Sequence, residues 1–380
     1  MDKKLFIGYL FAVIALFLYS YTQVDLSLTL SRLSIYQTIE KSFQNIGFYQ
    51  RPLSTGIFLF LVTVFYILYV MALRTRKLPL WRIIIPMTVI LIFSYPAFSY
   101  DIFNYMFDAK TVLVYHKIPY TITPLQFTGV EPWLSFMHWT HIPSTFMPFW
   151  IVLSLPAYLV GFGYFLGILW GFKALMAAAY LVCTGFIWKI LSDLDPQRRI
   201  RGTAIFALNP LVIFESLVSG HFDIVMMAFA MIAFYLYIHK KRFLSFVFLS
   251  FSAATKIMTI MLVPLFFVGW QRKWALAVIT IGFCLFIGIT KREILPWYLI
   301  WFIPWYALLP RIKWLTIIGT GLSIGYLLTY APFLYYGDYN PPVPVIKLWV
   351  TVIPLVISVL FVVYMNLFRT GFRLLPGKVD

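Results

Sequence analysis

The stretch Leu53-Ser-Thr-Gly-Ile-Phe-Leu-Phe-Leu-Val-Thr-Val-Phe-Tyr-Ile-Leu-Tyr-Val-Met-Ala-Leu73 is a long run without a charged side chain, and Arg51 and Arg74 flank it. A helix of about 20 apolar residues crosses the hydrocarbon core of a bilayer, so this run predicts a transmembrane helix. In the whole chain of 380 residues, 62% are hydrophobic and 11% are charged. Soluble chains contain about 45–50% apolar and about 25% charged residues. The composition therefore predicts an integral membrane protein.

Similar apolar runs recur along the chain, and we expect about twelve of them to cross the membrane as helices. The predicted spans are 5–22, 53–73, 82–99, 164–191, 202–219, 224–238, 243–255, 257–269, 274–290, 297–309, 314–333 and 346–368. Several are short, but short helices can cross where the bilayer thins or beside a water-filled cavity. The predicted fold is an all-α polytopic membrane protein in which residues 1–380 form a single transmembrane domain.

Residues 145–160 are apolar, but the run is short and two prolines interrupt it. If it crossed the membrane, the basic loops at 198–201, 240–242 and 272–273 would face outward, although short loops rich in Lys and Arg stay cytoplasmic. We therefore expect a juxtamembrane or re-entrant helix inside a long outer loop over 100–163. Both termini are then cytoplasmic. The formal charge of +17 then reflects basic loops that orient the chain in the membrane, and it does not indicate a surface that binds nucleic acid.

The most informative part of the outer loop is Asp101-Ile-Phe-Asn-Tyr105-Met-Phe-Asp108-Ala-Lys110. A helix over 102–114 would place Asp101, Tyr105 and Asp108 on one face, because residues three, four and seven apart are neighbours on a helix. Two carboxylates and a tyrosine can deprotonate a sugar hydroxyl and bind its neighbours. Alternatively, Asp101 caps the helix, and Asp108 pairs with a nearby lysine such as Lys110.

A second group of polar residues follows Asn209-Pro, with Glu215 inside the predicted span 202–219 and then Gly-His221-Phe-Asp223. A carboxylate inside a membrane is costly unless it is paired or faces water. Glu215 therefore contacts a ligand or pairs with a buried lysine. The candidate lysines are Lys173, Lys256 and Lys291. His221 and Asp223 either join the same site or belong to a simple turn with a helix cap.

Two further segments place cations and aromatic rings on the outer side. Lys256 is alone in an apolar run. If the chain turns there, Lys256 can meet a lipid phosphate; the alternative is a simple lysine at a helical hairpin. Arg292, Trp297 and Tyr298 lie in Lys291-Arg-Glu-Ile-Leu-Pro-Trp-Tyr. The basic pair suits a phosphate, and the rings either stack on sugars or form an aromatic belt at the membrane surface.

Other site classes have weaker support in the sequence. His116, His138 and His141 lie in the outer loop, but no HExxH or comparable ligand spacing occurs, so we expect no metal site. The chain also has no GxGxxG, P-loop or GxSxG motif, which argues against nucleotide-binding folds. We expect that no cofactor is required, although the chemistry does not exclude a divalent metal.

Taken in order, these segments resemble integral-membrane glycosyltransferases of the GT-C superfamily. Asp-Ile-x-x-Tyr-x-x-Asp at 101–108, followed by Pro119-Tyr120, resembles the first outer loop of polyprenol-phosphate-mannose-dependent mannosyltransferases and arabinofuranosyltransferase-like relatives of bacteria and archaea. The resemblance covers most of residues 95–300. Its other segments are His141-Ile-Pro-Ser-Thr-Phe-Met-Pro, Asn209-Pro210 to Asp223, Thr255-Lys256 and Pro296-Trp297-Tyr298.

The resemblance implies that Asp101 is the catalytic base of an inverting sugar transfer. The donor would be a polyprenyl-phosphate-linked sugar, namely mannose, and the acceptor a glycan or lipid on the outer face of a prokaryotic plasma membrane. Residues expected to bind the substrates are Tyr105, Asp108, Lys110, Tyr120, His141, Glu215, His221, Asp223, Trp297 and Tyr298. Those expected to bind the lipid phosphate are Lys256 and Arg292. Relatives often have Asp-Gly-Arg where this chain has Asp108-Ala-Lys110.

Two functions of other classes compete with this hypothesis. A transporter or lipid flippase would also have many spans, but transporters commonly show inverted repeats and polar sites at the membrane midplane. We find no repeat, and the polar residues gather at the predicted outer side. The other alternative is an inactive scaffold that binds lipid-linked glycans.

Overall fold

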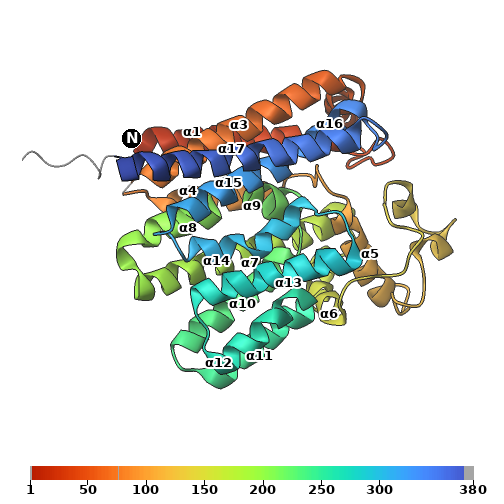
Figure 1. Ribbon diagram of the computed structural model, residues 1–380. Helices are drawn as coiled ribbons and strands as arrows, with labels where there is room; N and C mark the ends of the chain where they lie inside the picture. The colour runs from red at the N-terminus through yellow and green to blue at the C-terminus, as the bar shows by residue number, and fades with distance from the viewer. Residues whose placement is uncertain (1, 76, 372–380) are drawn as a thin grey trace, which may run out of the picture.

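The computed structural model describes residues 2–75 and 77–371, and every regular element in that part of the chain is helical. Figure 1 shows that most of the longer helices run in roughly the same direction and form one bundle. The longer helices are α1 (Asp2–Ser20), α3 (Arg51–Arg74), α4 (Leu80–Ile92), α5 (Asp101–Leu113), α6 (Pro148–Leu159), α7 (Phe165–Leu194), α10 (Asp223–Ile238), α11 (Arg242–Thr255), α13 (Arg272–Thr290), α15 (Lys313–Leu328) and α17 (Val343–Gly371). The predicted all-α class is confirmed.

Shorter pieces connect or extend these helices. They are η1 (Tyr21–Gln23), α2 (Ser34–Gln44), η2 (Asn45–Tyr49), η3 (Pro124–Phe127), η4 (Pro132–Ser135), η5 (Pro196–Arg198), α8 (Arg199–Ala207), α9 (Pro210–Val212), η6 (Ile213–Val218), η7 (Ile257–Leu262), α12 (Val263–Val268), η8 (Pro296–Trp301), α14 (Ile303–Ala307) and α16 (Tyr330–Tyr336). Two of them, η2 and η6, are π-helices.

Six helical segments are long and apolar enough to cross a membrane. They are Lys3–Gln23, Arg51–Arg74, Phe165–Leu194, Arg272–Thr290, Lys313–Tyr336 and Val343–Leu367. The pair Pro196–Ala207 and Pro210–Val218, bent by 51°, would make a seventh. The other predicted runs also form helices, but these are short or, over 297–309, divided into two pieces. A membrane protein with several spanning helices is supported, and the count of about twelve stays a prediction.

The outward faces of the longest helices are apolar, as contact with lipid requires. On α17, Leu360 and Phe361 expose 61% and 51% of their surfaces. On α3, Phe60 exposes 67%. Large apolar patches are rare on soluble monomers and usually mark an interaction surface or a membrane. The bundle therefore packs its core on one side of these helices and presents their other side to the bilayer.

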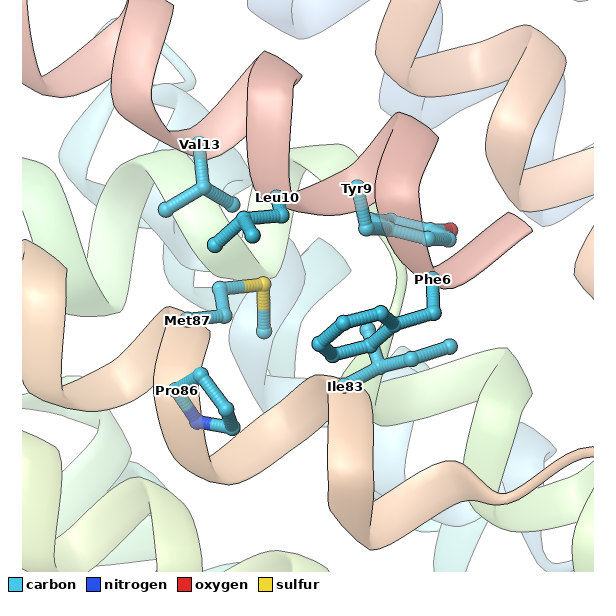
Figure 2. A pocket seen from close by; sticks show the side chains of 7 residues that line it. All are labelled: Phe6, Tyr9, Leu10, Val13, Ile83, Pro86 and Met87. Atoms are coloured by element: carbon cyan, nitrogen blue, oxygen red, sulfur yellow. The ribbon is translucent and has the colours of Figure 1, made fainter. Parts of the chain in front are cut away.

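Helices α1 and α4 pack against each other and leave a small hollow between them (Figure 2). The hollow is lined by Phe6, Tyr9, Leu10, Val13, Ile83, Pro86 and Met87. Pro86 lies inside α4, where a proline removes one backbone hydrogen bond and disturbs the regular helix. Because the lining side chains are apolar apart from the Tyr9 hydroxyl, the hollow is poorly suited to a sugar or a phosphate.

The two ends of the bundle carry different parts of the chain. In Figure 1, α1 begins and α17 ends at one end, whereas α5 and the segment 114–147 lie at the other. The expected helix within 145–160 is α6, which packs against α5, α7 and α11. Its position relative to the bilayer stays a prediction. The polar segment that follows α5 is thus held at one end of the bundle by α6.

Candidate active site

Helix α5 begins at Asp101, close to the predicted start of the helix over 102–114. Tyr100 is the residue before its first turn, and no side chain caps the helix. Instead, the backbone N–H of Asp101 donates a hydrogen bond to Ser99 Oγ at 3.3 Å. The alternative in which Asp101 caps α5 is therefore wrong, and its carboxylate is available for contacts with the surrounding loops.

The Asp101 carboxylate lies at the edge of a buried cluster of polar side chains, whose other members are Glu215, His221 and Asp223. Its Oδ1 accepts a hydrogen bond from Trp139 Nε1 at 3.3 Å, and its Oδ2 lies 3.9 Å from His221 Nδ1. The side chain retains 21% of its exposed surface. Burial raises the pKa of Asp101 to about 6, although the Trp139 hydrogen bond and the charge of Lys256 act in the opposite direction. Asp101 is therefore ionised at neutral pH but holds a proton more strongly than an exposed aspartate.

Asp108 lies two helical turns beyond Asp101 and is buried. Ser144 Oγ donates a hydrogen bond to Asp108 Oδ2 at 2.6 Å. Burial raises the pKa of Asp108 to about 7, and the hydrogen bond from Ser144 partly offsets this rise. The neighbouring Lys110 pairs with Glu131 instead, at 2.7 Å. Asp108 is therefore not an ordinary surface partner of Lys110.

The chain bends where α8 ends and α9 begins. Asn209 Oδ1 accepts a hydrogen bond from the backbone N–H of Leu211 at 3.0 Å, and Pro210 occupies the first turn. Both features favour the start of a new helix. The helix continues as the π-helix η6, which contains Glu215. π-Helical turns are frequent at functional sites, because they shift side chains away from the regular helical positions.

Lys173 and Gly220 fix the end of η6. Lys173 is buried on α7, and its ammonium group donates hydrogen bonds to the carbonyl oxygens of Leu217 and Val218. Gly220 has a φ of +75°, and a Cβ atom there would lie 2.9 Å from Ile102 Cδ1. A larger residue at position 220 would be strained both by its backbone conformation and by this contact. The turn that leads into α10 is thus fixed against α5.

Glu215 is fully buried and has no lysine partner among the described residues. Its Oε1 accepts a hydrogen bond from the Tyr330 hydroxyl at 2.9 Å, and its Oε2 lies 3.3 Å from His221 Nε2. The alternative in which a lysine pairs with Glu215 is therefore wrong. The His221 ring lies between the carboxylates of Asp101 and Glu215.

Several polar atoms of this cluster have no hydrogen-bond partner within the described part of the chain. They are Glu215 Oε2, both ring nitrogens of His221, and Asp223 Oδ2. Burial lowers the pKa of His221 well below its usual 6.5, so the ring is neutral. Buried polar atoms are normally hydrogen-bonded. Their concentration beside Asp101 indicates a functional site, since packing alone would favour apolar side chains.

An ion pair joins Lys256 to the polar cluster through Asp223. α11 ends before Lys256, which has an extended backbone, and η7 follows it directly. The predicted turn at Lys256 is therefore confirmed. Lys256 Nζ lies 2.7 Å from Asp223 Oδ1, and Trp301 Nε1 donates a hydrogen bond to the same oxygen. Lys256 is therefore not a simple hairpin lysine. Asp223 does not cap α10 either, because Phe222 is the N-cap residue and no side chain caps that helix.

The segment 291–301 supplies aromatic rings to the same region. Trp297 stacks on His221, with 3.9 Å between the ring centroids. Tyr298 is buried, and its ring centroid lies 4.6 Å from that of Trp301. Arg292 is exposed. Because Trp297 and Tyr298 pack on the polar cluster and its neighbours, these contacts do not favour the aromatic-belt alternative.

The other expected substrate-binding residues lie around this region in different settings. Tyr105 is buried, and its ring centroid lies 5.2 Å from that of Phe222. The Tyr120 hydroxyl donates a hydrogen bond to the carbonyl oxygen of Phe146 at 2.8 Å. His141 is exposed. The contacts of Tyr105 and Tyr120 are structural, and the substrate roles of all three residues stay predictions.

Three residues that donate hydrogen bonds to the candidate acids were not predicted from the sequence. They are Trp139, Ser144 and Tyr330. Trp139 lies between two loop histidines, and Ser144 lies within the segment that resembled the family. Either could have been suspected as a partner of an acid. Tyr330 lies within the predicted span 314–333, and no local pattern distinguishes it from the other aromatic residues of the chain.

Within residues 2–75 and 77–371, no group of three or more His, Cys, Asp or Glu side chains is placed to hold a metal ion. His138 stacks on Tyr100 instead, with 4.2 Å between the ring centroids. The expectation that the reaction needs no metal or cofactor stays a prediction. The groups that the described site offers for chemistry are a partly exposed carboxylate, a neutral imidazole, buried carboxyl groups and aromatic faces.

One family model matches residues 6–273 of the chain, and its description is MptA_B family, alpha-(1->6)-mannopyranosyltransferase, N-terminal domain. The matched region is well over half of the chain. It includes Asp101, Asp108, Glu215 and Lys256 and ends before Trp297. No curated protein and no solved structure gives a significant match to the chain.

Proposed function

The chain belongs to the MptA_B family of alpha-(1->6)-mannopyranosyltransferases, and from this we propose that it transfers mannose from a polyprenyl-phosphate donor to a hydroxyl group of a glycan or lipid. The family and the apolar helices together indicate a glycosyltransferase of the membrane. The donor class, the acceptor and the stereochemistry belong to the proposal.

The observation that carries the mechanism is the exposure of Asp101. Its side chain is 21% exposed, whereas the side chains of Glu215 and Asp223 are 0% and 1% exposed. A general base must reach the proton that it removes. Among these three acids, Asp101 is therefore the one best placed to meet an acceptor hydroxyl that enters from solvent.

In the proposed step, the Asp101 carboxylate removes the proton from the acceptor hydroxyl. The acceptor oxygen forms a bond to the anomeric carbon from the face opposite the phosphate. The bond between that carbon and the phosphate oxygen breaks, and its electron pair leaves with the polyprenyl phosphate. The configuration at the anomeric carbon is inverted, so a β-linked donor yields an α-linked product.

Two cations are candidates to stabilise the leaving phosphate. Arg292 is exposed, and no ion pair joins it to another described residue. Lys256 is 23% exposed but already pairs with Asp223. We assign the main contact to Arg292, with Lys256 as a second cation whose charge is shared with Asp223. Cations placed where negative charge develops lower the barrier of such a step.

The proposed site faces outward, and both termini are cytoplasmic. This orientation is supported by the basic loops, which lie together on one side only if 145–160 does not cross the membrane. It is also supported by the position of α5, which lies at the end of the bundle opposite the start of α1 and the end of α17 (Figure 1). A prokaryotic plasma membrane is part of the same proposal.

The donor assay tests this proposal directly. We expect the purified protein to transfer mannose from a synthetic polyprenyl-phosphate-mannose to an α-mannoside acceptor, and not from a nucleotide-linked mannose. Product formation can be followed by mass spectrometry, and the anomeric configuration by NMR spectroscopy. If no mannose is transferred from any prenyl-phosphate donor, the proposed donor is wrong. If the protein instead moves the intact donor across the membrane of vesicles, the flippase alternative is favoured.

The rate of transfer should depend on pH through Asp101. Because burial raises the pKa of Asp101 to about 6, the carboxylate is present above pH 6, and activity is lost as the pH falls through this value. Below it, kcat/KM should fall about tenfold for each pH unit. The control is Asp108→Asn, since the pKa of Asp108 is raised to about 7. If the fall of kcat/KM at low pH disappears in this variant, the titrating group is Asp108 instead.

A further inference from the structure

We infer that a pocket distant from Asp101 binds the phosphate group of an anionic phospholipid. The pocket lies between the start of α15 and the last turns of α17 and has a volume of about 410 Å³. It is lined by Arg198, Arg311, Lys313, Trp314, Val362 and Met365, among others. In Figure 1, α17 ends at the end of the bundle opposite α5. The inference is therefore independent of the proposed catalytic function.

The pocket carries an excess of positive charge. Arg311 is held in place by Asp195, with Nε–Oδ2 and Nη2–Oδ1 distances of 2.8 and 3.1 Å. Arg198 and Lys313 also line the pocket, and no ion pair joins either of them to another described residue. One acid thus faces three basic side chains. Like charges brought together in a cavity repel one another, and a bound anion relieves this repulsion.

The apolar part of the lining distinguishes a lipid from a free anion. Trp314 is 49% exposed, and tryptophan is favoured where a protein meets the membrane surface. Val362 and Met365 belong to the segment Val343–Leu367, and only 6% of the most apolar 18-residue stretch of this segment is buried inside the protein. Acyl chains can therefore lie along α17 while a headgroup enters the pocket. Basic pockets between membrane helices are known to hold anionic lipid headgroups.

A binding experiment with the full-length protein tests the inference. The protein in neutral detergent is titrated with dioleoylphosphatidylglycerol, and bound lipid is counted by native mass spectrometry. Dioleoylphosphatidylcholine and inorganic phosphate are the comparison ligands. We expect saturable binding of the anionic lipid, with an affinity at least about tenfold above that of the zwitterionic lipid, since each nearby basic residue strengthens such binding. Inorganic phosphate should not compete at equal concentration.

Arg198→Gln combined with Lys313→Gln should weaken binding of the anionic lipid at least about tenfold. The matched control is Lys77→Gln combined with Lys241→Gln, which removes the same charge from exposed lysines outside the pocket. Each single pocket variant serves if the double variant does not fold. Equal binding of both lipids, equal loss in the control, or full competition by inorganic phosphate would overturn the inference.

Discussion

Replacing Asp101 by Asn is expected to lower the rate of mannose transfer by about 10³-fold, because asparagine cannot accept the proton of the acceptor hydroxyl. Its side-chain oxygen can still accept the hydrogen bond that Trp139 Nε1 donates to Asp101. The fold should therefore be preserved. The loss should appear in kcat with little change in KM, since a base acts mainly in the transition state. Initial rates with the prenyl-phosphate donor and an unfolding curve measure both effects.

Asp108→Asn is the matched control for this experiment. It makes the same chemical change on the same helix, two turns away, at a carboxyl group that accepts a hydrogen bond from Ser144. We expect a smaller loss, expressed mainly in KM, if Asp108 contacts a substrate. Near-full transfer by Asp101→Asn would show that Asp101 is not the base. A loss of kcat only in Asp108→Asn would transfer that role to Asp108.

The fold class could be predicted from the sequence because it depends on local composition. A run such as 53–73 contains almost no charge, and any helix that it forms must be covered by lipid or by other apolar helices. The turn at Lys256 was also predictable, since an isolated lysine interrupts an otherwise apolar run. Which short helices cross the bilayer is a different question, because it depends on their tilt and on their neighbours.

The contacts of the site could not be predicted in the same way. Glu215 and Tyr330 are far apart in the sequence and meet because α16 and η6 both contact α3. Composition identified Glu215 as a costly buried acid but could not identify its partner. Two of the three candidate lysines have other partners: Lys173 donates hydrogen bonds to carbonyl groups of η6, and Lys256 pairs with Asp223.

Helix α2 has an arrangement of side chains that its sequence did not predict. It follows the first predicted span, and the predicted topology assigned it no role. Ile35 and Ile39 expose 72% and 51% of their surfaces on this helix, whereas Glu40 is buried. The Glu40 carboxylate accepts a hydrogen bond from the backbone N–H of Leu30 at 3.2 Å. An inward acid with outward isoleucines inverts the usual amphipathic pattern of a soluble helix. This arrangement suits a helix that lies against lipid.

Lys256→Gln is expected to destabilise the protein by about 3 kcal/mol, because it leaves the buried Asp223 carboxylate without its cation. The Trp301 hydrogen bond to Asp223 remains but carries no full positive charge. Asp223→Asn should cost less, since Lys256 is 23% exposed and its ammonium group can turn toward water. Unfolding curves in one detergent measure both values.

The double variant Asp223→Asn with Lys256→Gln separates the structural role of Lys256 from its proposed role in donor binding. Removing both charges should recover most of the stability lost in Lys256→Gln, because a buried ion pair contributes little beyond an uncharged pair of similar size. If Lys256 also contacts the donor phosphate, the double variant will remain stable but show a raised KM for the donor. An unchanged KM would leave Arg292 as the phosphate contact. A Lys256→Gln variant as stable as the wild type would contradict the ion pair itself.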